Sequence, residues 1–264
     1  MPPDVRFHGK GPYGVAVVHG GPGAPGSVAA IARELARDGT GVLEPLQTRT
    51  SLDGQVQELR DVLGTHATPP AVLIGHSWGA WLALIFASRH PEAVSRLVLV
   101  SSGPFEERYV PDLERRRLER LDPAERAEFL DLLRTAGAED SLFARLGQLA
   151  SKADSYDEVK VETDPADAIA VDGRMFQSVW TEAASMRRTG ALLEHAGRLA
   201  CPVLAIHGDH DPHPEAGVDE PLKAVVGDFR FVLLERCGHY PWRERHARDR
   251  FYQVLREFAA RGAV

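Results

Sequence analysis

The chain has 264 residues, of which 44% are hydrophobic and 26% are charged, and its formal net charge at pH 7 is −7. This length suits one α/β domain that carries an insertion, and the composition is typical of a globular protein with a sizeable core. The acidic balance argues against nucleic acid as a partner, because nucleic-acid binding needs a basic face. The N-terminal segment has no apolar run of signal-peptide length, and the apolar run at 80–87 is too short to span a bilayer. We therefore expect no membrane association and a cytoplasmic location.

Short β-rich runs alternate with helical runs along most of the chain. Several β-rich runs are continuously apolar, which is typical of parallel strands covered by helices on both faces. Apolar residues with helical spacing occur at 28–35, 52–63 and 251–258, and Ser51 is placed to cap the second of these helices. The alternation predicts a doubly wound, mostly parallel sheet. The predicted strands are Val15–His19, Val42–Glu44, Ala71–Gly75, Arg96–Ser101, Val203–His207 and Arg230–Leu234.

Residues 104–198 contain no good strand and are rich in Arg, Glu, Leu and Ala. Asp122-Pro123 and Asp164-Pro165 have the form of helix starts, with Asp as the N-cap and Pro in the first turn. We predict a helical cap at 104–198, inserted between two core strands, and a core made of 1–103 and 199–264. Most charges of this segment are interpreted as solvated helix faces. Trp180 and Met186 are interpreted as cap core, with the lining of a substrate pocket as the alternative.

The segment Gly75-His76-Ser77-Trp78-Gly79 follows the pattern G-x-S-x-G. An apolar strand leads into it and a helix leaves it, which is the setting of a nucleophile elbow. In such a turn the serine is strained, and the residues two before and two after must be small, as Gly75 and Gly79 are. The sequence therefore predicts that Ser77 is a nucleophile.

The segment His19-Gly20-Gly21-Pro22-Gly23 directly follows the first predicted strand. A serine nucleophile needs backbone N–H groups aimed at the developing oxyanion. We expect one from Trp78 and the other from Gly21, because glycine lets the backbone approach a substrate closely. The alternative for this loop is an ordinary Gly-Pro turn after a strand.

An acid and a histidine should follow the serine in that order. Asp211 comes just after the strand at 203–207, and His239 just after the strand at 230–234. Both would lie at the carboxyl ends of parallel strands, where open α/β sheets place their sites. We predict His239 as the general base and Asp211 as its orienting acid, with Asp209 bracing the turn. The alternative for His239 is a surface-loop histidine.

Five potential metal ligands crowd into seven residues of the same region. Because no metal-binding helix motif accompanies them and Asp211 already has a role, we predict no metal and no cofactor. These residues are His207, Asp209, His210, Asp211 and His213. The two cysteines, Cys201 and Cys237, are interpreted as free buried thiols, with a pair close in space as the alternative.

On these motifs, the sequence resembles the α/β-hydrolase superfamily over about 13–103 and 199–261. The HGGPG loop and the Ser-Trp-Gly of the elbow resemble its proline iminopeptidase branch. The resemblance implies a Ser77–His239–Asp211 triad, with Gly21 and Trp78 as the oxyanion hole. Two features depart from that branch. The elbow is GHSWG rather than GGSWG, and only about a dozen residues precede the first core strand, so the antiparallel strand pair usual there must be shortened or absent.

We predict a serine hydrolase that cleaves a small ester or an N-terminal aminoacyl amide through an acyl-enzyme. The expected partner is a small-molecule or short-peptide substrate, and the oligomeric state does not follow from the sequence. The alternatives are a carbon–carbon bond hydrolase and a slow-turnover ligand receptor on the same triad. A free amino terminus would need an anionic anchor in the cap. Glu182 is a candidate, although a solvated helix face is the preferred interpretation.

Overall fold

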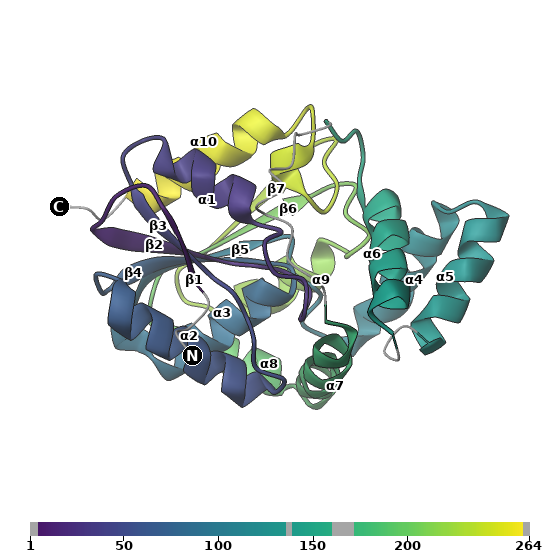
Figure 1. Ribbon diagram of the computed structural model, residues 1–264, viewed down its shortest axis with the longest axis horizontal. Helices are drawn as coiled ribbons and strands as arrows, with labels where there is room; N and C mark the ends of the chain where they lie inside the picture. The colour runs from purple at the N-terminus through teal and green to yellow at the C-terminus, as the bar shows by residue number, and fades with distance from the viewer. Residues whose placement is uncertain (1–4, 136–138, 160–171, 261–264) are drawn as a thin grey trace.

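The computed structural model describes residues 5–135, 139–159 and 172–260. Its seven strands form one sheet in the order β1-β3-β2-β4-β5-β6-β7, in which β1 is antiparallel to β3 and every other pairing is parallel (Figure 1). The predicted fold class is therefore confirmed. The strands are β1 (Val5–His8), β2 (Tyr13–Val18), β3 (Gly41–Pro45), β4 (Ala71–His76), β5 (Val94–Val100), β6 (Val203–Gly208) and β7 (Phe229–Leu234).

Strand β1 is the one strand of the described chain that the sequence analysis did not place. It has four residues and pairs with β3 at the edge of the sheet, so one short strand stands where an antiparallel pair was considered. No apolar run identifies it, because His8 and Arg6 alternate with its apolar residues. These two side chains face Glu44 of β3, whose carboxylate is buried and accepts a hydrogen bond from His8 Nε2 at 2.9 Å.

Helices cover both faces of the sheet, as the apolar stripes predict. On one face α1 (Ala29–Ala36) and α10 (Arg248–Ala260) enclose one hydrophobic cluster. On the other face α2 (Leu52–His66), α3 (Trp78–Arg89) and α9 (Ala216–Val225) enclose a second. Ser51 caps α2 as predicted, with its hydroxyl accepting the N–H of Gly54 at 3.1 Å. Short 3₁₀ helices occur at Pro91–Ala93, Glu107–Tyr109 and Pro241–Arg243.

The segment predicted as a cap contains α4 (Val110–Glu119), α5 (Pro123–Thr135), α6 (Asp140–Asp154), α7 (Gly173–Thr189) and α8 (Ala191–Ala196). The helix start at Asp122-Pro123 is confirmed, since the Asp122 carboxylate accepts the N–H groups of Ala124 and Glu125 at 3.0 and 2.9 Å. The start predicted at Asp164-Pro165 lies outside the described residues.

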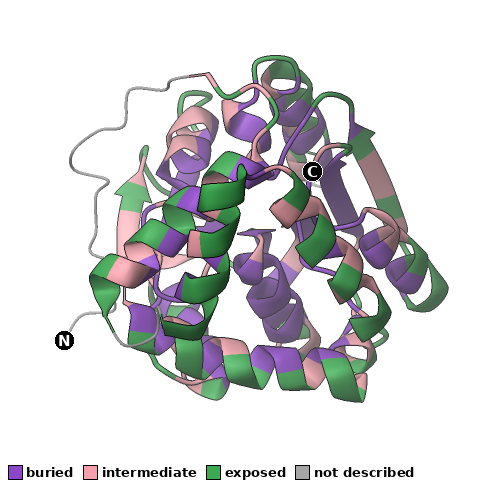
Figure 2. Ribbon diagram, turned by 90° about the vertical axis from the view of Figure 1, so that its right-hand side faces the viewer, coloured by how far each residue is buried: buried purple, intermediate pink, exposed green. Residues whose placement is uncertain are grey.

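These helices divide into two packing groups. Helices α7 and α8 contribute to the same hydrophobic cluster as α2 and α3, and Trp180 of α7 stacks on Trp81 of α3 with ring centroids 5.8 Å apart. Met186 packs against that cluster too. Helices α4, α5 and α6 project from the sheet, with outward faces exposed (Figures 1 and 2). Their inner faces form a small separate cluster of Leu121, Phe129, Leu132, Phe143, Leu146, Leu149 and Ala153.

Both cysteines are free thiols, as predicted. Cys237 is buried, whereas Cys201 is only partly buried. Among the described helices, none combines the length and the apolar character that a bilayer span requires.

Candidate active site

Ser77 occupies the turn between β4 and α3 at the centre of the sheet. Its backbone has φ 53° and ψ −117°, a region that side chains other than glycine rarely adopt and that costs conformational energy. A Cβ atom on Gly75 would lie 2.2 Å from the carbonyl oxygen of Gly79, and one on Gly79 would lie 2.4 Å from that of Val18. The tight turn therefore requires both glycines, as the elbow pattern predicts.

The HGGPG loop runs directly against this elbow. A Cβ atom on Gly20 would lie 3.0 Å from Cβ of Ser77, so the loop backbone and the serine are in contact. Gly21 has φ +52°, in the left-handed region that favours glycine. Trp78 is the first residue of α3, so its N–H has no acceptor inside the helix. In the described loops and turns, no backbone carbonyl accepts the N–H of Gly21 or that of Trp78, and their role as oxyanion donors stays a prediction.

Asp211 and His239 meet in the loops that follow β6 and β7. The His239 Nδ1 and Asp211 Oδ2 atoms are 2.7 Å apart, and both residues are buried. The ring of His76 lies next to that of His239, with centroids 4.9 Å apart, and its Nε2–H donates to the His239 carbonyl oxygen at 3.0 Å. The buried pair therefore lies beside the residue that immediately precedes Ser77.

Burial and charge act in opposite directions on these groups. Burial by itself raises the pKa of Asp211, but the neighbouring His239 and His213 lower that pKa well below its ordinary value of 3.8. Burial is the largest single influence on His239 and lowers its pKa, but the charge and hydrogen bond of Asp211 together with the charge of Asp154 raise it, and the net pKa lies above 6.5. Burial and the charge of His239 hold the pKa of His76 well below 6.5. Asp211 is therefore ionised, His239 is a basic imidazole and His76 is a neutral one.

His213 is a partner of Asp211 that sequence reasoning missed. Its Nδ1 and its backbone N–H both donate to Asp211 Oδ1, at 2.8 and 2.9 Å, and its ring stacks on that of His239 with centroids 4.6 Å apart. Burial lowers the pKa of His213 to about 4, so the ring is neutral. The sequence signal for this contact was the Asp-x-His spacing, because an aspartate side chain often accepts the backbone N–H of the residue two positions later.

Asp209 binds the backbone of the loop after β7. Its carboxylate accepts the N–H groups of Arg236 and Cys237 at 3.0 and 3.1 Å, which ties the loop after β7 to the loop after β6. This is the turn-bracing position expected for it.

The potential metal ligands of this region do not converge on one point. Ligand atoms of Asp211, His213 and His239 lie within 4.8 Å of one another, but the Nδ1 atoms of both histidines are already hydrogen-bonded to the Asp211 carboxylate, and the two rings stack on each other. His207 donates to the His213 carbonyl oxygen, and His210 packs on the ring of Tyr156. The arrangement fits a hydrogen-bonded cluster better than a metal centre, and the absence of a metal stays a prediction.

Helices α4 and α6 hold the histidine loop. The backbone N–H of His239 donates to the carbonyl oxygen of Asp154 at 2.8 Å. The Asp154 carboxylate is buried and binds Arg117 of α4 through two hydrogen bonds of 2.8 and 2.7 Å. Arg120 donates to the carbonyl oxygen of His210 at 2.7 Å. These charges were interpreted as solvated, because nothing in the run LERRRLER distinguishes the buried arginine from its exposed neighbours.

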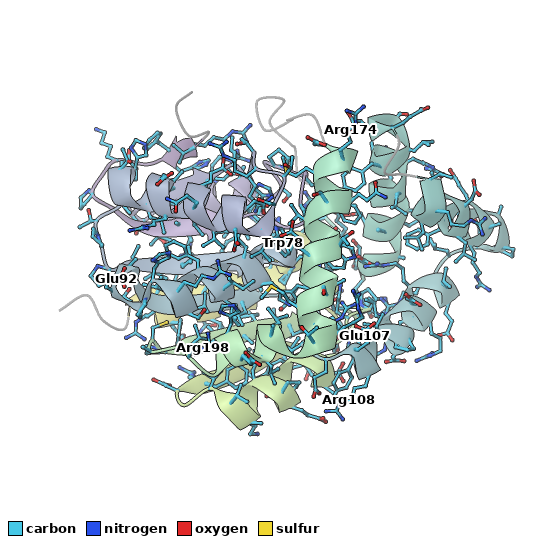
Figure 3. The ribbon with its side chains drawn as sticks, turned by 90° about the horizontal axis from the view of Figure 1, so that it is seen from below. Trp78, Glu92, Glu107, Arg108, Arg174 and Arg198 are labelled. Atoms are coloured by element: carbon cyan, nitrogen blue, oxygen red, sulfur yellow. The ribbon has the colours of Figure 1, made fainter. Side chains whose placement is uncertain are left out.

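Helix α7 borders the site on the side of the HGGPG loop and the elbow. Its N-cap residue, Asp172, donates its backbone N–H to the carbonyl oxygen of Gly23 at 2.8 Å, so the helix begins at the HGGPG loop. Figure 3 shows Trp78 next to α7, and both elements contribute to one hydrophobic cluster. The site is therefore bordered by α4 and α6 at the histidine and by α7 at the elbow.

A family model described as the alpha/beta hydrolase family matches residues 3–254, and the chain belongs to this family. A 2-hydroxy-6-oxononadienedioate/2-hydroxy-6-oxononatrienedioate hydrolase of Paraburkholderia phymatum is 26% identical over 212 residues, which cover 80% of this chain and 69% of that protein. A pimeloyl-acyl-carrier-protein methyl ester esterase of Chromobacterium violaceum is 26% identical over 75% of this chain and 73% of its own length.

Solved structures share the fold over nearly the whole chain. The structure of VinJ superposes with a TM-score of 0.71 at 20% identity, covering 97% of this chain and 93% of VinJ. Proline iminopeptidase of Mycobacterium smegmatis superposes with a TM-score of 0.66 at 20% identity, covering 97% and 94%. The resemblance to the proline iminopeptidase branch noted from the HGGPG loop is thus matched in the fold.

Proposed function

We propose that this protein is a serine hydrolase in which Ser77 is the nucleophile, His239 the general base and Asp211 the acid that orients it. The observation that carries the proposal is the buried 2.7 Å contact between Asp211 and His239, next to a strained serine turn. An ionised carboxylate at Nδ1 leaves Nε2 of His239 as the atom that accepts a proton, which is the role a general base needs.

The reaction is an acyl transfer in two steps. The Ser77 hydroxyl attacks a carbonyl carbon while Nε2 of His239 takes its proton, and Asp211 stabilises the imidazolium that forms. The N–H groups of Gly21 and Trp78 donate to the tetrahedral oxyanion. His239 then protonates the leaving group, and water cleaves the acyl-enzyme by the same sequence. Residues 104–198 act as a cap over the bound substrate, and no cofactor takes part.

A small ester is the substrate class that these contacts support best. An aminoacyl substrate brings an ammonium group, which needs an unpaired carboxylate once it is desolvated. Asp154 is the one buried acid among the described residues of 104–198, and Arg117 already binds it. Glu182, the anchor considered from the sequence, is exposed and accepts the N–H of Leu52 at 3.0 Å. Aminoacyl amides remain a second candidate on the HGGPG motif alone.

Carbon–carbon bond hydrolysis is the other candidate on the same triad. It is favoured by curated relatives at 24–26% identity that are named as 2-hydroxy-6-oxononadienedioate hydrolases. In such a reaction the serine attacks a ketone rather than an ester, and the leaving group is a stabilised carbanion that takes its proton from His239.

An active-site probe tests the proposal directly. A fluorophosphonate is expected to label wild-type protein at Ser77, and Ser77→Ala is expected to lose both labelling and several orders of magnitude in turnover.

A substrate panel assigns the substrate class. It contains short-chain p-nitrophenyl esters, prolyl and alanyl arylamides with their N-acetylated forms, and a 2-hydroxy-6-oxo-dienoate. Rapid cleavage of the esters alone supports the esterase. Arylamide cleavage that acetylation abolishes would support an aminopeptidase. Labelling without turnover on any class would support the receptor.

A further inference from the structure

Gln47 connects the HGGPG loop to the nucleophile elbow. It lies in the loop between β3 and α2 and is buried. Toward the HGGPG loop, its backbone N–H donates to Nε2 of His19 at 3.1 Å, and its side-chain Nε2 donates to the His19 carbonyl oxygen at 3.0 Å. Toward the elbow, its Oε1 accepts the indole N–H of Trp78 at 3.0 Å. One amide side chain thus uses its donor on one segment and its acceptor on the other.

The contacts with His19 extend to the glycines of the loop. Since Nε2 of His19 accepts from Gln47, the ring proton lies on Nδ1, which donates to the carbonyl oxygen of Gly20 at 3.0 Å. Burial lowers the pKa of His19 to about 4, so the ring stays neutral and keeps this tautomer. The peptide whose oxygen His19 binds is the one that supplies the N–H of Gly21.

The contact with Trp78 acts on the first residue of α3. Trp78 carries the other backbone N–H of the proposed oxyanion hole, and its indole is 2% exposed. Gln55 of α2 accepts the same indole N–H at 3.1 Å and donates to the carbonyl oxygen of Arg49 at 2.9 Å. No hydrogen bond joins Gln55 to a described residue of the HGGPG loop, so Gln55 supports the elbow without connecting the two segments.

We propose that Gln47 is a positioning residue that keeps the N–H groups of Gly21 and Trp78 aimed at one point. This inference rests on the proposed function. Two donors from separate segments stabilise an oxyanion only if their spacing holds as the tetrahedral centre forms. A misplacement of about 1 Å costs about 100-fold in rate. Because the oxyanion exists only in the transition state, the loss falls on kcat rather than on KM.

The test compares three variants with matched chemistry. Gln47→Met keeps the length of the side chain but removes both side-chain hydrogen bonds. Gln47→Glu keeps an acceptor for Trp78 and loses the donor to His19. Gln55→Met makes the same polar-to-apolar change at a buried glutamine of the same network. For each, kcat and KM on the best ester, affinity for a boronic acid that mimics the oxyanion, affinity for the carboxylate product and the thermal midpoint are measured.

Gln47→Met and Gln47→Glu are each expected to lower kcat about 10- to 100-fold with KM within about 3-fold, and to weaken the boronic acid by a similar factor. The product affinity should change little. Gln55→Met is expected to lower the thermal midpoint like Gln47→Met while kcat falls less than about 5-fold, because the link to His19 is intact. Equal kcat losses in Gln47→Met and Gln55→Met would overturn the inference. So would kcat losses that simply parallel the drop in thermal midpoint across the three variants.

The labelling of wild-type protein separates the two proposals. Wild-type protein that takes no fluorophosphonate at Ser77 overturns the serine hydrolase, and the role of Gln47 with it. Wild-type protein that is labelled, together with Gln47 variants of unchanged kcat, overturns the role of Gln47 and leaves the serine hydrolase standing.

Discussion

His239 is surrounded by groups that act on its proton in opposite directions. Burial is the largest single influence and favours the neutral ring, whereas the charge and hydrogen bond of Asp211 and the charge of Asp154 favour the charged ring, and the net pKa lies above 6.5. Only the neutral ring accepts the Ser77 proton. Activity should therefore be low at acidic pH and rise as the pH passes the raised pKa of His239.

We expect kcat/KM to increase with pH through an apparent pKa above 6.5. In Asp211→Asn the raising influence of Asp211 is lost while burial remains, so the same limb should move to lower pH in the residual activity. A pH–rate profile of both proteins measures this. A limb at the same pH in both would contradict the assignment of His239 as the titrating base.

The two aspartates of the loop after β6 should differ sharply. Asp211→Asn should cost about 10⁴-fold in kcat, because an amide at this position favours the wrong imidazole tautomer. Asp209→Asn should cost less than about 10-fold, because the amide oxygen still accepts one of the N–H groups of Arg236 and Cys237. Single-turnover rates of the two variants decide between them, and a larger loss in Asp209→Asn would reverse the assignment.

The sequence predicted where the residues with a strong local pattern lie. Ser77 and the glycines around it lie in the predicted turn, and Asp211 and His239 lie at the ends of their predicted strands, while their catalytic roles stay predictions. Gln47 and His213 were not placed in the site, because their partners come from other segments and no local spacing marks a buried amide or a second imidazole. Long-range side-chain contacts are what the sequence leaves open at this scale.

At the scale of elements, α4 and α6 are joined by the buried ion pair of Arg117 and Asp154. Arg117→Met should destabilise the protein by about 3 kcal/mol, because the Asp154 carboxylate is left buried without its partner. It should also lower kcat, since Asp154 holds the His239 backbone. Urea unfolding and steady-state kinetics measure the two effects.

Arg115→Met on the same helix is the matched control. The side chain of Arg115 is 55% exposed and pairs with those of Asp112 and Glu119, which are 34% and 59% exposed, so its loss should cost less than about 0.5 kcal/mol. A similar loss of stability in both variants would show that the buried pair has no special weight.

The strands and helices that the sequence predicted correctly are those with buried faces. Strands covered on both faces and helices with one apolar stripe were placed to within a few residues, because their patterns arise from the core they share. Strand β1 was missed, since an edge strand whose polar side chains meet one buried glutamate has neither signature. The sequence did not predict that α7 and α8 of the segment 104–198 pack on the main core, because an apolar stripe does not say which surface it covers.

At the scale of the molecule, the projecting helices have a hydrophobic cluster of their own. Phe129→Ala removes a buried ring from that cluster and should weaken it by about 3–5 kcal/mol. The amides of α4, α5 and α6 should then exchange faster with solvent deuterium, while those of β4 and β5 keep their protection. Leu84→Ala, in the main core, should accelerate exchange in both regions. Uniform acceleration in Phe129→Ala would show that the two clusters unfold together.

The bond from the His239 N–H to Asp154 has a consequence for how this chain can be recombined. Three loops of the site share hydrogen bonds with the segment 104–198: the histidine loop with Asp154, the loop after β6 with Arg120, and the loop after β2 with Asp172. A chimaera that joins this core to the equivalent segment of a relative would therefore fold but work poorly unless the donor supplies a carbonyl at the position of Asp154. Transplants that include residues 117–154 together should regain activity that shorter grafts lack. In an exchange of segments between relatives, the helices of 104–198 and the histidine loop they hold should therefore be moved together.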